Sequence, residues 1–128
     1  MFCNQCEQTA KGKACDYLGI CEKNEGVAGL QDLLTHAVQG LSHVAMAGRK
    51  AGIVDSKVNH FTTEAIFSCL TNVDFDPARF EKLIKEAVQL RNEMKAKVDA
   101  AGGSINSSFA SVTLTPADSL ADLEKQGM

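Results

Sequence analysis

Four of the chain's five cysteines lie within its first 21 residues and follow the pattern C-x2-C-x8-C-x5-C. They are Cys3, Cys6, Cys15 and Cys21. Two thiolates separated by two residues can bind one metal centre from a tight turn, and the longer gaps let the chain return to its opposite side. A cubane [4Fe–4S] cluster takes four such thiolates. We interpret these cysteines as ligands of one metal centre.

The same cysteines allow two other interpretations. A structural zinc site also takes four cysteines, but its usual form is two C-x2-C knuckles, whereas the second pair here is separated by five residues. Two disulfides are possible, but clustered thiols in a cytosolic chain indicate metal binding before disulfide bonds. Spacing alone therefore leaves the choice between an iron–sulfur cluster, zinc and thiol chemistry open.

The composition excludes several classes of partner. The net charge is −3, the pI is about 5.5 and the basic residues form no stripe, so we predict no nucleic-acid surface. No apolar run reaches the length of a membrane span, so we predict no membrane association. The segment that begins Met1-Phe2 has no charged region followed by an apolar stretch, so we expect no secretory signal. A cytoplasmic protein is the expectation that follows.

The elements that must position the cysteines divide the 128 residues into three parts. Residues 1–24 contain Gly12, Gly19 and many polar side chains and fit neither the helix nor the strand period. We predict that they form a cluster-binding loop, which the cysteines organise. Residues 25–102 are predicted to form a three-helix bundle. Residues 103–128 are predicted to form a loop and a short C-terminal helix, within one domain overall.

Two helices are predicted from apolar side chains that recur every three or four residues. The first runs over about Glu25–Gly52, with Asn24 as its N-cap. Several glycines within this helix indicate positions where another element approaches closely. The second helix runs over about Lys57–Thr71, with Ser56 or Asp55 as its N-cap.

The third helix has the clearest boundaries. Asp76 as N-cap followed by Pro77 is a strong start signal, and Gly102–Gly103 ends the apolar pattern. Residues 103–114 are predicted to be a loop or an extended segment, and a last helix is predicted over about Thr115–Lys125. Three long helices with short connections predict an all-α fold. This fold is an antiparallel three-helix bundle with an N-terminal cysteine-rich cluster-binding loop and a short C-terminal helix.

The residues around the cysteines form a specific pattern of their own. The segment Met1–Ala10 reads MFCNQCEQTA, and Gly12, Cys15, Gly19 and Cys21 follow it. Similarity continues through Val27–Leu34 and, more weakly, through Asn72–Phe80. With these segments the chain resembles the N-terminal part of a hybrid cluster protein, a family also known as prismane proteins or hydroxylamine reductases. The resemblance covers most of the chain and is most specific in the cysteine segment.

This resemblance implies that Cys3, Cys6, Cys15 and Cys21 hold a cubane [4Fe–4S] cluster. The gaps of eight and five residues are similar to those of the cubane branch of the family, whereas another branch has longer gaps and a [2Fe–2S] centre. Asn4 occupies a position that is often aromatic in the family. This departure removes no ligand.

The resemblance also implies that the chain is the N-terminal helical domain of a longer reductase. The family's catalytic centre is a mixed oxo–sulfido iron cluster held by His, Glu and Cys residues of later domains, and this chain has no second group of cysteines. We therefore expect no catalytic residues here and no turnover by the chain alone. Its expected role is to relay electrons toward the hybrid cluster, which reduces hydroxylamine to ammonia or nitric oxide to nitrous oxide. Expected partners are the remaining domains or an electron donor protein, with a homodimer through an exposed bundle face as a further expectation.

A different class of function is a structural module, in which zinc or a cluster staples the loop to the bundle without a redox role. Cys69, on the apolar face of the second helix, is interpreted as a buried structural thiol. Lys11, Lys13 and Lys23 flank the cysteines. They either offset the negative charge of a cluster and raise its potential or are solvated loop lysines.

Overall fold

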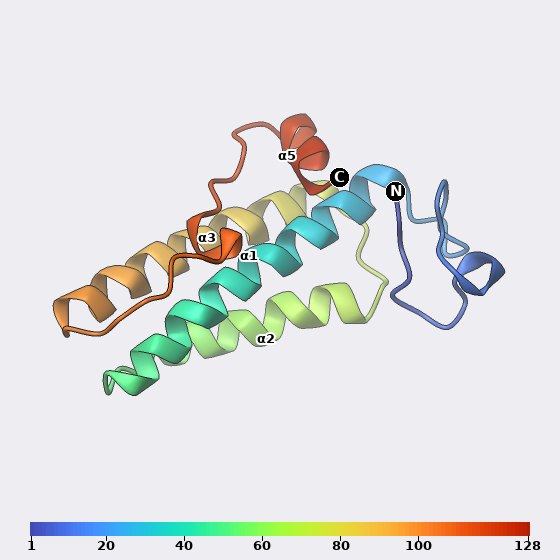
Figure 1. The fold of residues 1–128 in the computed structure, drawn as a ribbon. Coiled ribbons are helices and arrows are strands. Elements are labelled where there is room, and N and C mark those ends of the chain that lie inside the picture. The colour runs from blue at the N-terminus through green and yellow to red at the C-terminus, as the bar shows by residue number, and fades with distance from the viewer.

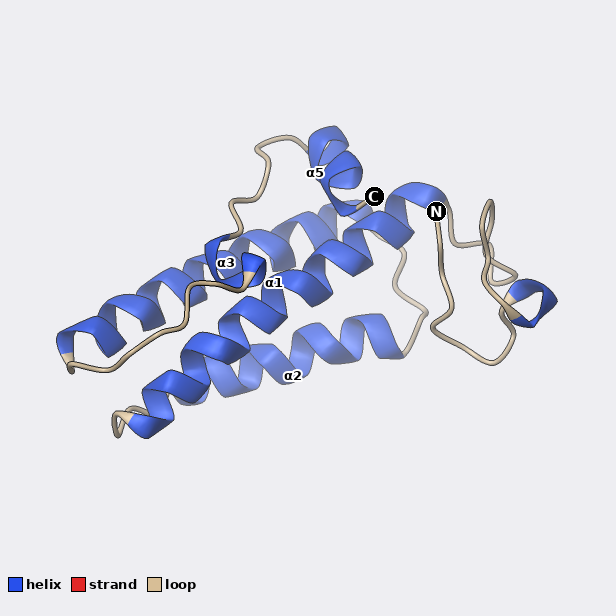
Figure 2. Cartoon of the chain, viewed as in Figure 1, coloured by secondary structure: helices blue, strands red, loops and turns tan.

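The computed structural model describes residues 1–128, apart from the side chain of Ala10. The described chain is all-α, as predicted: helices are joined by loops, and no strand is present in this part (Figure 2). No helix among the described residues is both long and apolar enough to cross a membrane. The helices are α1 (Glu25–Lys50), α2 (Ser56–Leu70), α3 (Pro77–Ala100), α4 (Ala110–Thr113) and α5 (Leu120–Gly127), after a short 3-10 helix, η1 (Ala10–Gly12).

The three long helices begin at the N-caps that the sequence predicts. The Asn24 side chain accepts a hydrogen bond of 2.9 Å from a backbone N–H in the first turn of α1. Asp55, one of two candidates, accepts a bond of 2.9 Å at α2, and Asp76 accepts one of 3.0 Å at α3. Each bond satisfies a backbone donor that has no partner within its own helix.

The helices α1, α2 and α3 form an antiparallel three-helix bundle (Figure 1). α1 and α3 run in one direction, and α2 runs back, antiparallel to both. α1 packs most extensively against α3, and it also contacts α4 and α5. Residues 1–23, which we call the cysteine loop, lie at the end of the bundle where α1 begins, α2 ends and α3 begins (Figure 1).

The main core lies between α1 and α3. Leu30 and Leu41 of α1 and Phe80 and Ile84 of α3 all have 0% of their surface exposed. Burial of one side chain of this size contributes about 1.5–3 kcal/mol to the free energy of unfolding. Conformational entropy cancels most of the sum. This packing fixes the position of the bundle end that carries the cysteine loop.

Residues 103–114, predicted as a loop or an extended segment, contain the helical turn α4. Ser111 and Val112 of this turn are buried. Gly40 of α1 makes room for them, because a Cβ at this position would collide with the backbone carbonyl of Ser111. The guanidinium of Arg91 donates a hydrogen bond of 3.1 Å to the same carbonyl oxygen. The turn therefore depends on contacts with α1 and α3, which no local pattern in the sequence indicates.

The last helix begins later than predicted. The pattern predicts a helix over Thr115–Lys125, whereas α5 begins only after Ser119. The side chain of Gln126 is the reason: it accepts a hydrogen bond of 2.9 Å from the N–H of Ala117 and donates one of 2.8 Å to the carbonyl of Thr115. The carbonyl of Thr115 is thereby engaged, whereas in a helix beginning at Thr115 it would accept from the N–H four residues further on. Ser119 is the N-cap instead, and its hydroxyl accepts a first-turn N–H at 3.2 Å.

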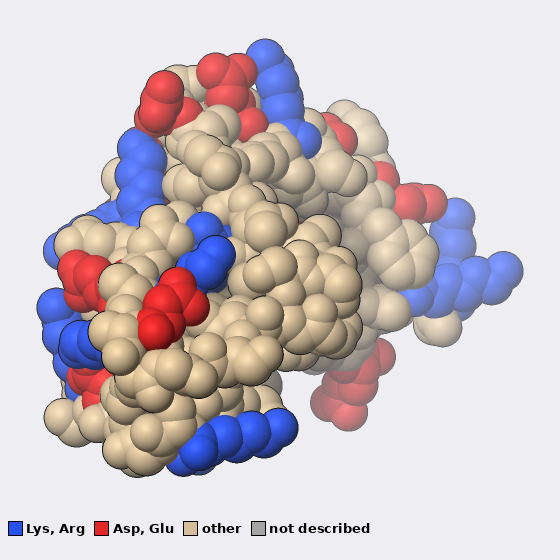
Figure 3. Space-filling view, turned by 60° about the vertical axis from the view of Figure 1, so that its left-hand side comes forward, with Lys and Arg blue, Asp and Glu red and all other residues tan. Residues whose placement is uncertain are grey.

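Charged side chains of both signs are mixed on the surface. Figure 3 shows Lys and Arg beside Asp and Glu on one face, next to a broad area without charged side chains. Some of these charges pair, as in Arg79–Glu64 at 2.8 Å and Lys85–Glu81 at 2.7 Å. Solvent-exposed pairs of this kind contribute at most about 1 kcal/mol each. The fold therefore depends on the apolar core rather than on its surface charges.

Replacement of Gly40 by alanine tests the close contact between α1 and α4. We expect Gly40→Ala to lower the free energy of unfolding by about 1–3 kcal/mol, because the backbone of Ser111 cannot move aside without disturbing its buried hydrogen bond. Gly26→Ala is the matched control in the same helix, since its Cβ would meet the flexible carboxylate of Glu124. Urea unfolding followed by circular dichroism measures both variants. Equal losses would contradict the role assigned to the contact.

Candidate metal centre

All four cysteines of the N-terminal pattern lie around one cavity. Cys3, Cys6, Cys15 and Cys21 line this cavity, whose volume is about 240 Å³. Part of its wall is Asn72, from the link between α2 and α3. Cys15 is buried, Cys3 is half-buried, and Cys6 and Cys21 are exposed. The structure thus brings together the residues that the sequence predicts as ligands, and their binding of a metal stays a prediction.

A backbone pairing joins two of these cysteines. The N–H of Cys3 donates to the carbonyl of Cys15 at 3.0 Å, and the N–H of Cys15 donates to the carbonyl of Cys3 at 2.8 Å. Residues that exchange both hydrogen bonds in an antiparallel pair have Cα atoms about 5.5 Å apart. The residues between them, Cys6 included, are closed into a loop. In the described part of the chain, no three His, Cys, Asp or Glu side chains are arranged to hold a single metal ion.

Two tight turns present the other two cysteines. Thr9 donates to the carbonyl of Cys6 from both its backbone N–H, at 3.3 Å, and its hydroxyl, at 2.7 Å. The second turn is closed by the N–H of Gly19, which donates to the carbonyl of Lys23 at 2.8 Å. Cys21 lies within this turn. Local hydrogen bonds, rather than regular secondary structure, therefore fix the backbone that carries these thiols.

The surroundings of Cys21 favour its thiolate. Partial loss of solvent raises the pKa of this thiol, but four effects lower it: the side chain of Asn72, the backbone of Lys23, the positive charge of Lys23, and the backbone of Cys21 itself. These effects together prevail, so the pKa of Cys21 lies below its ordinary value. The thiolate is the form of cysteine that binds metals. Asn72 has a φ of 50°, a left-handed conformation that Asn tolerates better than most residues.

Lys23 places a buried positive charge beside the cavity. Only 1% of this residue is exposed. Its Nζ lies 3.8 Å from Cys3 Sγ, 3.3 Å from Gln5 Oε1 and 5.8 Å from the centroid of the Phe75 ring. None of the ion pairs found among the described residues includes Lys23. Because a buried charge without an opposite charge is unfavourable, the cavity suits a negatively charged occupant.

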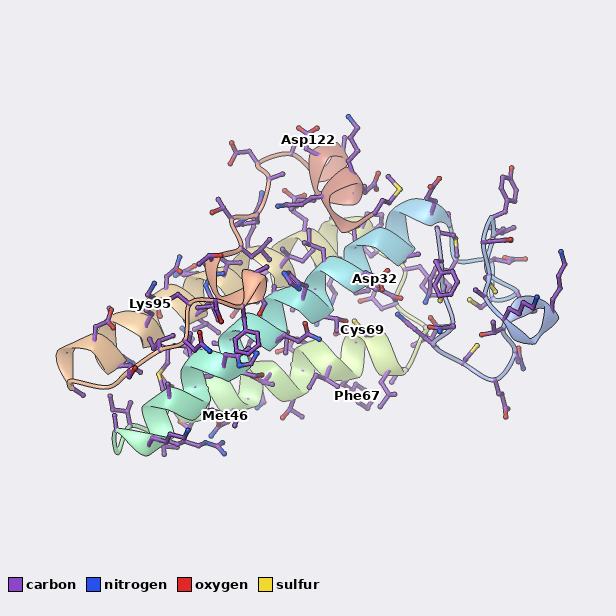
Figure 4. All side chains as sticks on the ribbon, viewed as in Figure 1. Asp32, Met46, Phe67, Cys69, Lys95 and Asp122 are labelled. Atoms are coloured by element: carbon purple, nitrogen blue, oxygen red, sulfur yellow. The ribbon has the colours of Figure 1, made fainter. Side chains whose placement is uncertain are left out.

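The fifth cysteine lies outside this cavity. Cys69 of α2 is half-buried and lines, with Asp32 of α1, an adjoining groove of about 640 Å³ that shares Cys6 with the cavity (Figure 4). Burial raises the pKa of the Cys69 thiol, a hydrogen bond with Thr35 and the charge of Lys23 oppose this, and the charge of Asp32 adds to it. The net pKa is raised, so Cys69 is a protonated thiol at neutral pH. The thiol is thus less buried than predicted, and its structural role stays a prediction.

The sequence did not indicate every residue at the cavity. Asn72 lines the cavity and Phe75 contacts Lys23, and both belong to the link between α2 and α3, far along the chain from the cysteines. The similarity of this link to the family's pattern was the available signal, but it carried no information about contact with the loop. From the sequence, Lys11, Lys13 and Lys23 have the same two interpretations. The structure distinguishes them, because Lys23 is buried and the other two are exposed.

Comparisons with known proteins identify the family. The model of the Prismane/CO dehydrogenase family matches residues 1–125. The protein "Hydroxylamine reductase" of Syntrophobacter fumaroxidans is 53% identical over 127 residues, which are 99% of this chain and 23% of that protein. The proteins of the same name from Methanocella arvoryzae and Maridesulfovibrio salexigens are 45% and 46% identical over 99% of this chain, and 23% and 22% of their lengths are covered.

These comparisons confirm the resemblance inferred from the sequence. The chain spans 23% of the length of two of these relatives. Proteins of the matched family bind iron–sulfur clusters. With a family match over almost the whole chain, the protein belongs to the Prismane/CO dehydrogenase family and represents the N-terminal domain of a hybrid cluster protein.

Proposed function

We propose that this chain binds a [4Fe–4S] cluster through Cys3, Cys6, Cys15 and Cys21 and transfers electrons as part of a hydroxylamine reductase-like protein. The observation that carries the proposal is the single cavity that all four cysteines line. The relatives named hydroxylamine reductase support the redox class.

The size of the cavity supports a cluster in preference to a single ion. A zinc ion binds four thiolates at about 2.3 Å, which draws all four sulfur atoms toward one point. A cubane takes its four thiolates at separate corners, so its ligands surround a larger volume. A cavity of about 240 Å³ with four cysteines in its wall suits the second arrangement. When bound, such a cluster supplies one-electron oxidation and reduction.

The side chains around the cavity are suited to holding negative charge. Lys23 lies beside the sulfur atom of Cys3, and Asn72 forms part of the cavity wall and lowers the pKa of the Cys21 thiol. Positive charge and hydrogen-bond donors near sulfur stabilise thiolates and a negatively charged cluster. Cys6 and Cys21 are exposed, so an electron donor protein has access to the rim of the cavity.

We assign hydroxylamine reduction itself to other parts of a longer protein. The chain spans less than a quarter of its relatives and holds one cysteine, Cys69, beyond the N-terminal group. In this proposal the chain relays electrons in the cytoplasm and has no turnover alone.

Three exposed apolar side chains lie on α2: Ile66, Phe67 and Leu70. We assign them to contact with the remaining domains. A homodimer through an exposed bundle face stays a prediction.

A structural module is the second candidate. The backbone pairing of Cys3 with Cys15 shapes the loop, and the contact between Lys23 and the Phe75 ring fastens it to the bundle. A metal in the cavity would reinforce both contacts whether or not it transfers electrons. Metal content separates the zinc form of this module from the proposed cluster, because zinc has no redox chemistry. Reversible one-electron reduction separates an electron-transfer cluster from a purely structural one.

Metal content is the first test of the proposal. Protein prepared without oxygen is expected to contain about four irons and about four acid-labile sulfides per chain, the content of a cubane, together with the visible absorption of a cluster. Iron and sulfide analysis with a visible spectrum measures this. About one zinc per chain without sulfide, even after anaerobic reconstitution, would favour the structural module.

Serine in place of Cys6 or Cys15 is expected to abolish cluster binding, because each change removes one of the four thiolates. Cys69→Ser is the matched control, since this thiol lies outside the cavity. It should keep the full iron and sulfide content and lose only some thermal stability. Retention of the cluster in the Cys6 or Cys15 variant would refute the ligand assignment, and loss in the Cys69 variant would show that this thiol takes part.

Gly19→Ala tests the turn around Cys21 without a change of ligand. The added Cβ would lie 3.1 Å from Cys21 Sγ and 3.1 Å from the Cβ of Lys23, so the turn must shift. We expect cluster occupancy to fall while helical content stays at the wild-type level. Gly52→Ala is the control: it lies in the turn after α1, at a φ of 80°, where a Cβ costs about 1–2 kcal/mol of stability. Its cluster occupancy should not change, and equal occupancy in the two variants would contradict the role of Gly19.

A further inference from the structure

We propose that Lys23 sets the reduction potential of the cluster by placing a buried positive charge, unpaired with any carboxylate among the described residues, beside the thiolate ligands. This inference rests on the proposed function, because it requires a cluster in the cavity of the four cysteines. It gives a role to a residue that is not itself a ligand.

Burial distinguishes Lys23 from the other lysines of the cysteine loop. Lys11 and Lys13 are exposed, whereas 1% of Lys23 is exposed. The interaction between two charges strengthens as the effective dielectric constant falls, so a buried ammonium acts several times more strongly than a solvated one. Salt also screens a buried charge less than an exposed one. One lysine of the three is therefore placed to influence the cavity strongly.

The contacts of Lys23 leave its charge available to the cavity. Its Nζ is within hydrogen-bonding distance of Cys3 Sγ, and its charge also acts on the thiol of Cys21. The other two contacts, with Gln5 Oε1 and with the Phe75 ring, are with neutral groups. Neither of these groups carries a charge that would cancel that of the ammonium.

The acidic group Asp32 does not neutralise this ammonium. Loss of solvent raises the pKa of the Asp32 carboxyl, and the charge of Lys23 lowers it by less, so the net shift is upward. None of the ion pairs in the described part of the chain joins the two residues.

The redox consequence follows from charge alone. Reduction adds one electron from an electron donor protein, makes the charge in the cavity more negative by one, and neither forms nor breaks a bond. A fixed positive charge nearby stabilises the more negative state, so Lys23 raises the potential. Phe75, from the link between α2 and α3, helps to keep the ammonium out of water. The link thereby preserves the strength of the interaction.

The test compares midpoint potentials of the full chain and its variants, reconstituted with iron and sulfide without oxygen. Lys23→Met removes the charge and keeps most of the side chain, Lys23→Arg keeps the charge, and Lys11→Met and Lys13→Met remove exposed charges as matched controls. We expect Lys23→Met to disfavour reduction by about tenfold or more, which is about 59 mV for a one-electron couple. Lys23→Arg should lie nearer the wild-type potential, and the controls should not differ from it. The difference should persist at high ionic strength.

Iron and sulfide content, measured on the same samples, separates this inference from the proposed function. Lys23→Met with a full cluster at the wild-type potential overturns the inference and leaves the proposed function intact. A wild-type chain that assembles no cluster overturns both.

If Lys23→Met loses the cluster, Lys23→Gln replaces it, because its amide keeps a hydrogen-bond donor. A lowered potential then supports the inference and an unchanged one overturns it. Cluster loss in both neutral variants but not in Lys23→Arg would show that the charge retains the cluster instead of tuning it, and would also overturn the inference.

Discussion

The surface of α1 has to accommodate four other helices, which restricts the side chains that it can carry. α2 and α3 pack along it, while α4 and α5 come close enough to require glycine. Gly40 leaves room for the backbone of Ser111, and Gly29 leaves room for the backbone carbonyl of Glu124, which would lie 2.9 Å from a Cβ. Each glycine costs about 1 kcal/mol of helix propensity, and the contacts that it permits offset this cost. A helix held on several sides has a well-defined first turn.

The cysteine loop depends on that first turn. Asn24 caps α1, and Lys23 directly precedes it. The chain therefore enters the helix with the lysine side chain held between Cys3 and Phe75. The loop, the start of α1 and the link between α2 and α3 meet at this one side chain. Regular secondary structure contributes little to the order of the cavity, which depends on these contacts and on local turns.

Local signals in the sequence explain how much of this structure could be predicted. Asn24 as a cap, Asp76 followed by Pro77, and the spacing of the cysteines each act over a few residues, and the corresponding helix starts were confirmed. The turn α4 and the late start of α5 depend on Ser111 against α1 and on the side chain of Gln126. These contacts join segments that no short pattern relates.

The same limit applies to the candidate site. Spacing and clustering favoured one centre for the four cysteines, and the structure brings them around one cavity. The contributions of Asn72 and Phe75 could not be predicted, because they require the path of α2 and α3 through space. The burial of Lys23 depends on the same path, so its difference from Lys11 and Lys13 is visible only in the fold.

The position of Asn72 in the wall of the cavity also has a consequence for the order of events during protein synthesis. The cysteines leave the ribosome first, and the segment with Asn72 and Phe75 follows only after α1 and α2 have been made. Until then the cavity lacks the part of its wall that Asn72 forms, and Lys23 lacks its contact with the Phe75 ring. An assembly factor that delivers a metal cofactor would thus meet the finished cavity only once most of the bundle exists. Cofactor insertion would then follow the synthesis of the segment that contains Asn72 and Phe75.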